Sequence, residues 1–167
     1  MRQHLPLSTL MPCDPVVSGI IVAMASLFSK IHAGEIPAAF IFRDEHWFGI
    51  LDLFPVTPGH VLLIPSQEAP LIQELPAGAL ATMGDTVSRA CACLRSALGC
   101  DAVSVLVRDG AAAGQEIPHV HIHCIPRYNG DEAHHFSGGS YGDDEHMVRA
   151  AMDDMVAKLS AAWPGAA

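Results

Sequence analysis

The chain has 167 residues, the length of one domain or of one domain with extensions. Half of the residues are hydrophobic (50%) and 16% are charged, which supports a folded core and excludes wholesale disorder. Nine basic against eighteen acidic residues give a formal net charge of -9, which argues against binding to long nucleic acid or to an anionic membrane. Ten histidines outnumber the lysines and arginines, so the composition singles out histidine chemistry.

The cysteines and the amino terminus favour a reducing, cytoplasmic location. The five cysteines are odd in number and form no Cys-x-x-Cys pair, so neither a disulfide framework nor a thiolate zinc site is predicted. Residues 1–25 are expected to be an N-terminal extension, in which the apolar run 16–25 is only weakly similar to a secretory leader. Met24 is an alternative start. No apolar run approaches the roughly 20 residues that span a bilayer.

The first part of the regular region predicts a short helix and three strands. Leu27, Phe28 and Ile31 share one helical side of residues 26–34, which end at a glycine. Three apolar, β-rich runs separated by turn residues follow, and they predict a three-stranded meander. These runs cover residues 38–42, 47–53 and 60–65.

The second part predicts a long helix, two strands and a final helix. Apolar side chains recur every three or four residues between Pro76 and Gly99, at Leu80, Met83, Val87, Cys91, Leu94 and Leu98. Strands are predicted at 102–107 and 118–125, around a Gly/Ala loop, and a final helix over about 144–162. The expected organisation is an extension (1–25), a domain (26–130) and an acidic segment with the last helix (131–167). That segment holds seven acidic and two basic residues, so it carries -5 of the net -9.

Three histidines alternate with apolar residues in the last predicted strand. Because side chains of a strand point alternately to its two faces, His119, His121 and His123 are expected on one face while the apolar residues between them pack on the other. Such a row favours a catalytic site. Zinc binding through the three imidazoles is a second interpretation, and chance exposure on a strand is the plainest one.

The segment from Gly114 to Arg127 resembles the characteristic motif of the histidine-triad (HIT) family, including the Gly-Gln pair before the histidines. Residues 30–37 and 51–65 resemble two further HIT segments in the same order. The resemblance covers about residues 26–130. It implies an α+β fold in which a five-stranded antiparallel sheet packs against one long and one short helix, to which this chain adds a C-terminal helix. Family members are commonly homodimers that join two sheets around nucleotide-binding clefts.

The resemblance also implies an activity, which is the cleavage of nucleoside 5′-phosphate derivatives at the α-phosphate without a metal or other cofactor. It makes His121 the nucleophile of a nucleotidyl-histidine intermediate, assisted by His119, His123 and His60, with Gln115 near the phosphate. A neutral imidazole can attack phosphorus when a hydrogen bond holds its other nitrogen. His123 favours the hydrolase-like branches, because the transferase branch commonly has glutamine there.

The expected partner is a purine nucleotide. By resemblance, Asp52 accepts hydrogen bonds from the ribose hydroxyls, and Gly114 belongs to the loop that approaches the phosphates. Arg108 stands where the family usually has asparagine, and Glu116 adds negative charge to the cleft. The resemblance assigns the base pocket to a set of apolar residues: Leu27, Phe28, Ile31, Ile36, Ile50 and Leu53.

One family feature is expected to be missing. Many HIT proteins bind a structural zinc through two cysteines near the first helix and a later histidine, where this chain has Ser26, Ser29 and Glu68. No metal is therefore expected. The sequence leaves open whether the substrate is a nucleoside phosphoramidate or a dinucleoside polyphosphate. A non-catalytic module that binds nucleotides or proteins is the alternative, because Arg108 and Glu116 change the cleft.

Overall fold

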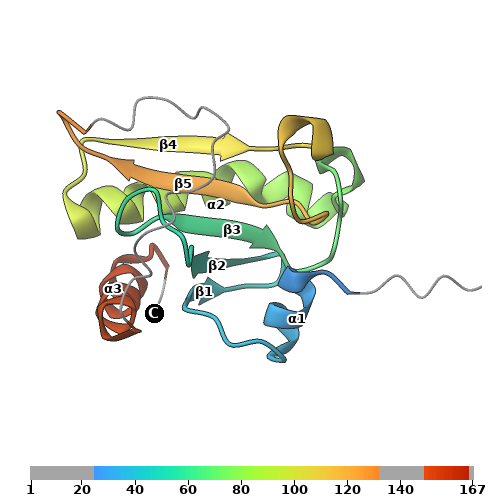
Figure 1. Ribbon diagram of the computed structural model, residues 1–167, viewed down its shortest axis with the longest axis horizontal. Coiled ribbons are helices and arrows are strands. Elements are labelled where there is room, and N and C mark those ends of the chain that lie inside the picture. The colour runs from blue at the N-terminus through green and yellow to red at the C-terminus, as the bar shows by residue number, and fades with distance from the viewer. Residues whose placement is uncertain (1–24, 132–148, 166–167) are drawn as a thin grey trace, which may run out of the picture.

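The computed structural model describes residues 25–131 and 149–165, and it confirms the expected α+β fold. The expectations for residues 1–24 and for the beginning of the last helix lie outside the described residues. Five strands form one antiparallel sheet in the order β1-β2-β3-β5-β4 (Figure 1). In chain order the elements are α1 (Leu27–Ala33), β1 (Phe40–Arg43), β2 (Trp47–Leu51), β3 (Val61–Pro65), α2 (Ala77–Leu98), β4 (Ala102–Val107), β5 (Ile122–Arg127) and α3 (Arg149–Ala162).

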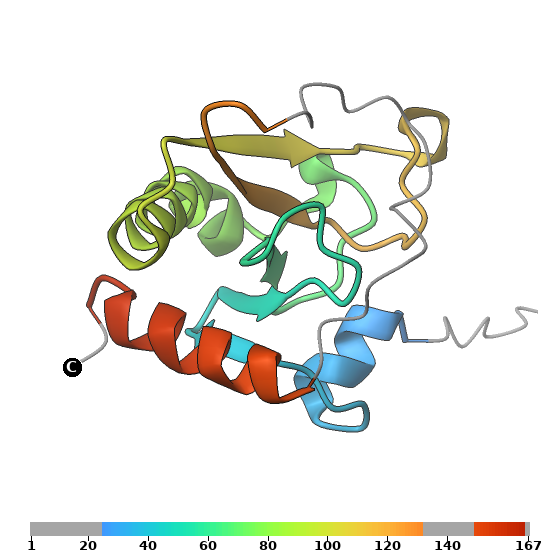
Figure 2. The same ribbon diagram turned by 60° about the vertical axis from the view of Figure 1, so that its left-hand side comes forward.

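The two faces of the sheet carry two separate apolar layers. Trp47 and Leu63 point to the face that packs against α2 and α3. Phe48 and Leu62 point to the opposite face, where Phe28 of α1 covers them. Figure 1 shows α2 behind the sheet and α1 near the ends of β1 and β2, and Figure 2 shows α3 alongside β1. The apolar layer on the face covered by α1 has fewer residues than the layer on the other face.

The expected meander of three strands is confirmed as β1, β2 and β3. In the β2–β3 hairpin Leu51 lies opposite Val61, and the next pair is joined by a hydrogen bond from the Asp52 N–H to the His60 carbonyl (2.9 Å). This register places the carboxyl group of Asp52 beside the imidazole of His60. Two residues that are eight positions apart in the sequence therefore meet at the mouth of the same hairpin.

The short helix α1 is defined at both of its ends. The Ser26 hydroxyl accepts a hydrogen bond from the Ser29 N–H, and Gly34 ends the helix in the left-handed conformation (φ 81°). Seven residues are too few for a helix that is stable in isolation. Its position therefore depends on the packing of Phe28 and Ile31 against the sheet.

The long helix α2 is confirmed, and most of its expected apolar side faces the core, with Leu80 as the exception. Leu80 is 49% exposed, whereas Leu94 is fully buried. Small side chains are also buried along this helix, which lets it lie close to the sheet. The buried residues of α2 are Ala79, Thr86, Ala90, Cys93 and Leu94. The spacing of large apolar residues did not include the small buried ones, such as Ala79 and Ala90.

The last helix, α3, belongs to the main core. Leu159 is fully buried in the layer shared with α2, and the Trp163 ring stacks on Phe42 with centroids 3.8 Å apart. The Arg89 guanidinium of α2 donates to the Pro164 carbonyl just after α3 (3.0 Å from Nε). None of the described helices is both long and apolar enough to cross a membrane.

The strand that carries the histidines begins later than expected. It was predicted over residues 118–125, but β5 runs from Ile122 to Arg127. Before it, the Val120 N–H donates to the Ala69 carbonyl (2.7 Å), in the loop after β3. The His119 N–H donates to the Ile117 carbonyl (2.8 Å) in a tight turn. His119 and His121 therefore lie in the approach to β5, and only His123 lies within the strand.

We expect Gly59→Ala to destabilise the fold more than Gly34→Ala does. Both glycines have positive φ (90° and 81°), which costs a substituted alanine roughly 1–2 kcal/mol. A Cβ at Gly59 would also overlap the Leu98 side chain, whereas a Cβ at Gly34 meets no atom within 4 Å. Chemical denaturation should show a loss of about 2–3 kcal/mol for Gly59→Ala and about 1 kcal/mol for Gly34→Ala. Equal losses would mean that the packing around Gly59 is unimportant.

Candidate active site

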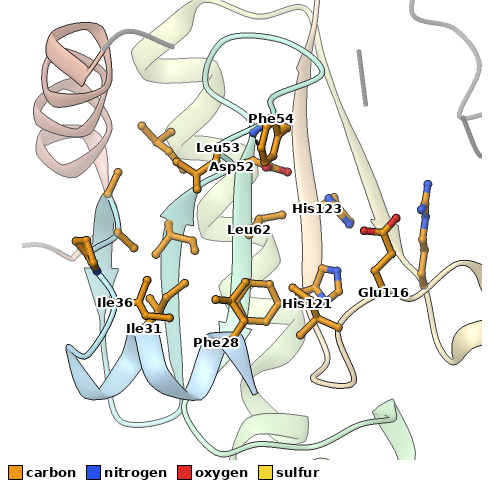
Figure 3. Close-up of a pocket in the computed structure, with 18 of the residues that line it drawn as sticks. Phe28, Ile31, Ile36, Asp52, Leu53, Phe54, Leu62, Glu116, His121 and His123 are labelled. Atoms are coloured by element: carbon orange, nitrogen blue, oxygen red, sulfur yellow. Dashed lines mark hydrogen bonds between the residues drawn. The ribbon is translucent and has the colours of Figure 1, made fainter. Parts of the chain in front are cut away.

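A cavity of about 280 Å³ lies between α1 and the sheet, at the ends of β2, β3 and β5. In Figure 3, Ile31 and Ile36 lie at its α1 end, Asp52 lies near the loop after β2, and His121, His123 and Glu116 lie on the opposite side. Every binding residue expected from the sequence lines this cavity: Leu27, Phe28, Ile31, Ile36, Ile50, Asp52, Leu53, Arg108 and Gly114. The apolar end is well suited to a flat ring, since apolar side chains enclose it.

His121 presents one ring nitrogen to the cavity. Its Nδ1 lies 2.8 Å from the main-chain oxygen of His119, and because a carbonyl only accepts, this nitrogen carries the ring proton. Nε2 then holds a lone pair. Burial lowers the pKa of His121 below its usual range, so the ring is neutral near pH 7. A neutral imidazole with one committed nitrogen is the form that acts as a nucleophile.

His60 and His123 are joined by a hydrogen bond, and the position of the proton on each ring follows from its partners. The Val56 N–H donates to His60 Nδ1 (3.3 Å), so the proton of His60 lies at Nε2, which donates to His123 Nδ1 (3.0 Å). The ring proton of His123 therefore lies at Nε2. Burial lowers the pKa of both imidazoles to about 3, so both are neutral. His123 lines the cavity and His60 supports it from behind.

His119 does not line the cavity, although it was expected on the same face as His121 and His123. Its Nε2 donates to the Pro65 carbonyl (3.0 Å), and its Nδ1 accepts from the Ser26 hydroxyl (2.8 Å). Both ring nitrogens are thus bonded to the protein. The structure places this ring between α1 and the end of β3, where it is fully buried.

Asp52 lies at the end of β2, half-buried and lining the cavity. Its Oδ1 accepts from the Phe54 N–H (2.9 Å), and its Oδ2 lies 3.4 Å from His60 Nδ1. Burial raises the pKa of this carboxyl to about 6, and the hydrogen bond from Phe54 opposes that rise. Above pH 6 the carboxylate is an acceptor for hydroxyl groups of a ligand.

Gln115 holds the loop before the histidines instead of lining the cavity. Its side-chain oxygen accepts from the Gly110 N–H (2.8 Å), and its amide nitrogen donates to the Pro70 carbonyl (2.9 Å). These two bonds fix the turn that carries Gly114, which does line the cavity. The side chain of Gln115 therefore lies behind the loop. For it to contact a phosphate, as expected, both of these hydrogen bonds would have to rearrange.

Two opposite charges, those of Arg108 and Glu116, lie at the end of the cavity beyond the histidines. Arg108 donates through Nη1 to the Gly114 carbonyl (3.2 Å), and Asp109 accepts from the Ile72 N–H (2.9 Å). Glu116 is exposed and lines the cavity. Burial and the hydrogen bond to His119 have the largest effects on the pKa of His121. Of the two charges, Arg108 lowers this pKa and Glu116 raises it. The two charges therefore oppose each other at the ring of His121.

Ser26, Ser29 and Glu68 do not fit the zinc ion that the family resemblance implies at their positions. Protein zinc sites are built from thiolate, imidazole and carboxylate ligands, and neutral hydroxyls are not among them. The three residues bond one another instead. Ser29 Oγ donates to Glu68 Oε2, and the Ser26 N–H donates to the same oxygen (2.9 Å). Ser26 Oγ lies 3.1 Å from Ser29 Oγ.

Sequence reasoning missed several residues around the cavity. Leu62 of β3 follows His60 by two positions and pairs with His123 in the sheet, so the period of two could have identified it. Phe54 and Ile117 also line the cavity, but they lie in loops that show no such period. The roles of Ser26 and Glu68 as hydrogen-bonding partners depend on contacts across the fold.

Several known proteins are similar to this chain in sequence. The chain is 39% identical over 105 residues to an uncharacterised HIT-like protein of Methanocaldococcus jannaschii, covering 63% of this chain and 81% of that protein. It is 40% identical over 105 residues to an adenylylsulfatase of Arabidopsis thaliana, covering 63% of this chain but only 53% of the plant protein. An adenosine 5′-monophosphoramidase of Schizosaccharomyces pombe is 28% identical over 136 residues, with 81% of this chain and 99% of that one covered.

A solved structure and a family comparison agree with these relatives. The crystal structure of a zinc-bound histidine triad family protein from Mycobacterium smegmatis superposes with a TM-score of 0.70 at 31% identity, covering 84% of this chain and 94% of that one. The family model described as HIT domain matches residues 33–130. That match spans the sheet, the long helix and all four site histidines. This chain therefore belongs to the HIT domain family.

Proposed function

We propose that this protein is a metal-independent hydrolase of nucleoside 5′-phosphate derivatives that works through a nucleotidyl-histidine intermediate on His121. The observation that carries the proposal is the hydrogen bond from His121 Nδ1 to the His119 carbonyl (2.8 Å). It leaves the Nε2 lone pair for attack at the side of the ring that lines the cavity. Two substrate classes fit this chemistry, nucleoside phosphoramidates and dinucleoside polyphosphates.

The cavity suggests where the parts of a purine nucleotide bind. The base occupies the apolar end near Ile31 and Ile36, and the ribose hydroxyls donate to Asp52. The α-phosphorus then lies between Asp52 and Glu116, where the imidazoles of His121 and His123 are. The leaving group extends toward the charged end of the cavity.

Two displacements complete the reaction. His121 Nε2 forms a bond to the α-phosphorus while the bond from phosphorus to the leaving group breaks, and the leaving group takes its proton from solvent. His123 donates a hydrogen bond from Nε2 to a phosphate oxygen as negative charge develops. The oxygen of a water molecule then forms a bond to phosphorus while the bond to His121 breaks, the water releases one proton to solvent, and the imidazole returns to its neutral form. The products are a nucleoside monophosphate and the protonated leaving group.

The names of two relatives support a nucleotide hydrolase. They are an adenylylsulfatase and an adenosine 5′-monophosphoramidase, and both names describe adenosine monophosphate bound to another group. The same four histidines of the site lie within the segment that matches the HIT domain. A cavity of about 280 Å³ with an apolar end supports binding of a nucleoside.

Hydrogen bonds already made by the histidines support metal independence. A zinc site of His119, His121 and His123 would require His119 to give up the hydrogen bond at one of its ring nitrogens. Among the described residues, Asp52, His60 and His123 offer ligand atoms within 4.8 Å of one another. The hydrogen bond between the two imidazoles uses a nitrogen of each ring (3.0 Å). Metal binding would compete with the arrangement that the reaction needs.

The second candidate is a nucleotide-binding or protein-interaction module without catalysis. Arg108 and Glu116 favour it, because they place opposite charges beside the leaving group. Under this alternative the protein binds adenosine monophosphate but turns over neither substrate class.

His121→Ala should abolish turnover of adenosine 5′-phosphoramidate and of diadenosine tetraphosphate, with a loss of at least about 10³-fold in kcat, because the nucleophile is gone. Mass spectrometry of acid-quenched wild-type protein should detect adenylylated His121. EDTA should leave the rate unchanged. His46→Ala is the matched control, since His46 is half-buried and lies beside Gly78 on α2, away from the cavity.

Two results would contradict the hydrolase proposal. One is a His121→Ala protein that remains active but loses activity with EDTA, which would indicate a metal mechanism. The other is wild-type protein that binds adenosine monophosphate and turns over neither substrate, which would establish the binding module instead.

Nucleotide affinity should fall as the pH drops through about 6. The carboxyl of Asp52 has its pKa raised to about 6, so below that pH it is protonated and accepts ribose hydroxyls poorly. Burial lowers the pKa of His121, so the nucleophile is protonated less readily than an ordinary histidine as the pH falls. Calorimetric titration with adenosine monophosphate between pH 5 and 7.5 should show a dissociation constant that rises about tenfold per pH unit below 6. Asp52→Asn should bind weakly without this pH dependence; a variant that retains it would exclude Asp52 as its source.

We also propose that the protein forms a homodimer through β4, the strand at one edge of the sheet. Val105 in this strand is 45% exposed, and an edge strand offers unpaired main-chain groups to a second copy. Light scattering after size exclusion should give the mass of two chains. Val105→Glu should convert the dimer to monomer, whereas Ala161→Glu should not, because α3 packs beside β1 at the opposite edge. A monomeric wild-type protein would refute this arrangement.

A further inference from the structure

A cluster of polar side chains joins α1 to the histidine segment behind the cavity. It contains Ser26 and Ser29 from the start of α1, Glu68 from the loop after β3, and His119 from the approach to β5. The Ser26 N–H donates to Glu68 Oε2 (2.9 Å), and the Ser29 hydroxyl donates to the same oxygen. One carboxylate oxygen therefore holds both serines, which stand where the family resemblance places two cysteine ligands of a structural zinc.

The direction of each hydrogen bond in this cluster follows from its partners. Because the Pro65 carbonyl can only accept, His119 carries its proton at Nε2 (3.0 Å) and its Nδ1 must accept. The Ser26 hydroxyl supplies that proton (2.8 Å) and accepts in turn from the Ser29 N–H (3.1 Å). Every bond in the series is satisfied without changing the ring of His119.

The charge on Glu68 strengthens the series. Hydrogen bonds from Ser29 and Ser26 hold the pKa of this carboxyl below its usual range, so it is ionised at neutral pH. Bonds to an ionised acceptor are about twice as strong as bonds between neutral groups. Glu68 thus fastens the first turn of α1 to the loop after β3, even though its own side chain is exposed.

The fixed position of His119 affects the imidazole of His121 in the cavity through two contacts. Its main-chain oxygen accepts the ring proton of His121 (2.8 Å), which decides the nitrogen at which His121 holds its lone pair. Phe28, which lies between the two serines in the first turn of α1, packs its ring against both imidazoles, with centroids 5.8 Å from His119 and 5.1 Å from His121. A shift of α1 would move both contacts.

We infer that Glu68 is a positioning residue for the reaction: through Ser29 and Ser26 it fixes His119 and α1, and thereby the orientation of the nucleophilic ring of His121. This inference rests on the proposed function of the site. Glu68 touches no substrate. A displacement of about 1 Å at a reacting group can cost up to 10²-fold in rate, so a support of this kind acts on kcat more than on nucleotide affinity.

The experiment compares Glu68→Ala, Glu68→Gln and Ser29→Ala with the control Glu35→Ala, which removes an exposed carboxylate just beyond the other end of α1. Glu68→Ala should lower kcat on adenosine 5′-phosphoramidate about tenfold while the dissociation constant of adenosine monophosphate changes less than twofold. Glu68→Gln should recover kcat to within about threefold of wild type, because its amide oxygen still accepts both bonds. Ser29→Ala, which interrupts the series, should resemble Glu68→Ala.

A second measurement does not depend on turnover. Nitrogen-15 spectra of the imidazole rings report which nitrogen carries the proton. His121 should be protonated at Nδ1 in the wild type and in Glu35→Ala, and should show averaged ring signals in Glu68→Ala and Ser29→Ala. If Glu68→Ala does not fold, Ser29→Ala and Glu68→Gln provide the same comparison.

Each outcome decides the inference. A kcat within twofold of wild type in the folded variants, or unchanged His121 ring signals, would overturn it, as would lowered thermal stability as the sole effect. If wild-type protein turns over neither substrate, the proposed function fails, and the ring spectra alone then determine whether Glu68 positions His121.

Discussion

The hydrogen bond from His121 Nδ1 to the main-chain oxygen of His119 is the contact on which the site depends. An imidazole in water exchanges its proton between two nitrogens, and only one of the two forms presents a lone pair to the cavity. A backbone carbonyl is a suitable partner because it cannot donate and cannot change its protonation. The turn before β5, which delays the start of that strand, is what brings this carbonyl to the ring. An irregular backbone here has a direct chemical use.

Burial and backbone partners prepare the other histidines in the same way. The Val56 N–H fixes His60, which fixes His123, and the Pro65 carbonyl fixes His119. Burial is the main cause that keeps the rings of His60 and His123 neutral, and the neighbouring imidazoles act in the same direction, so no carboxylate needs to hold a proton there. The sheet provides this environment by placing alternate residues of β3 and β5 under α1, with the larger apolar layer on its other face.

Sequence patterns predicted the parts of this site that obey a local period. Helical spacing placed Phe28 and Ile31 on the cavity side of α1, and strand alternation placed His123 there. The patterns did not predict that His119 turns away from the cavity or that Gln115 holds the loop, because the partners of these side chains, such as Ser26 and Pro70, are distant in sequence. The start of β5 was misplaced for the same reason, since the Val120 N–H bonds to Ala69.

The loop between β2 and β3 begins at Asp52 and ends at His60, and it is tied to β5 where Thr57 donates to the Pro126 carbonyl (2.7 Å). The proposed sugar contact and the support for His123 are therefore parts of one rigid connection. Sugar selectivity and turnover cannot be varied independently by exchanging this loop. A natural or engineered replacement of this loop that accepts deoxyribose would also lower the rate of turnover, unless the new loop keeps the spacing between its two ends.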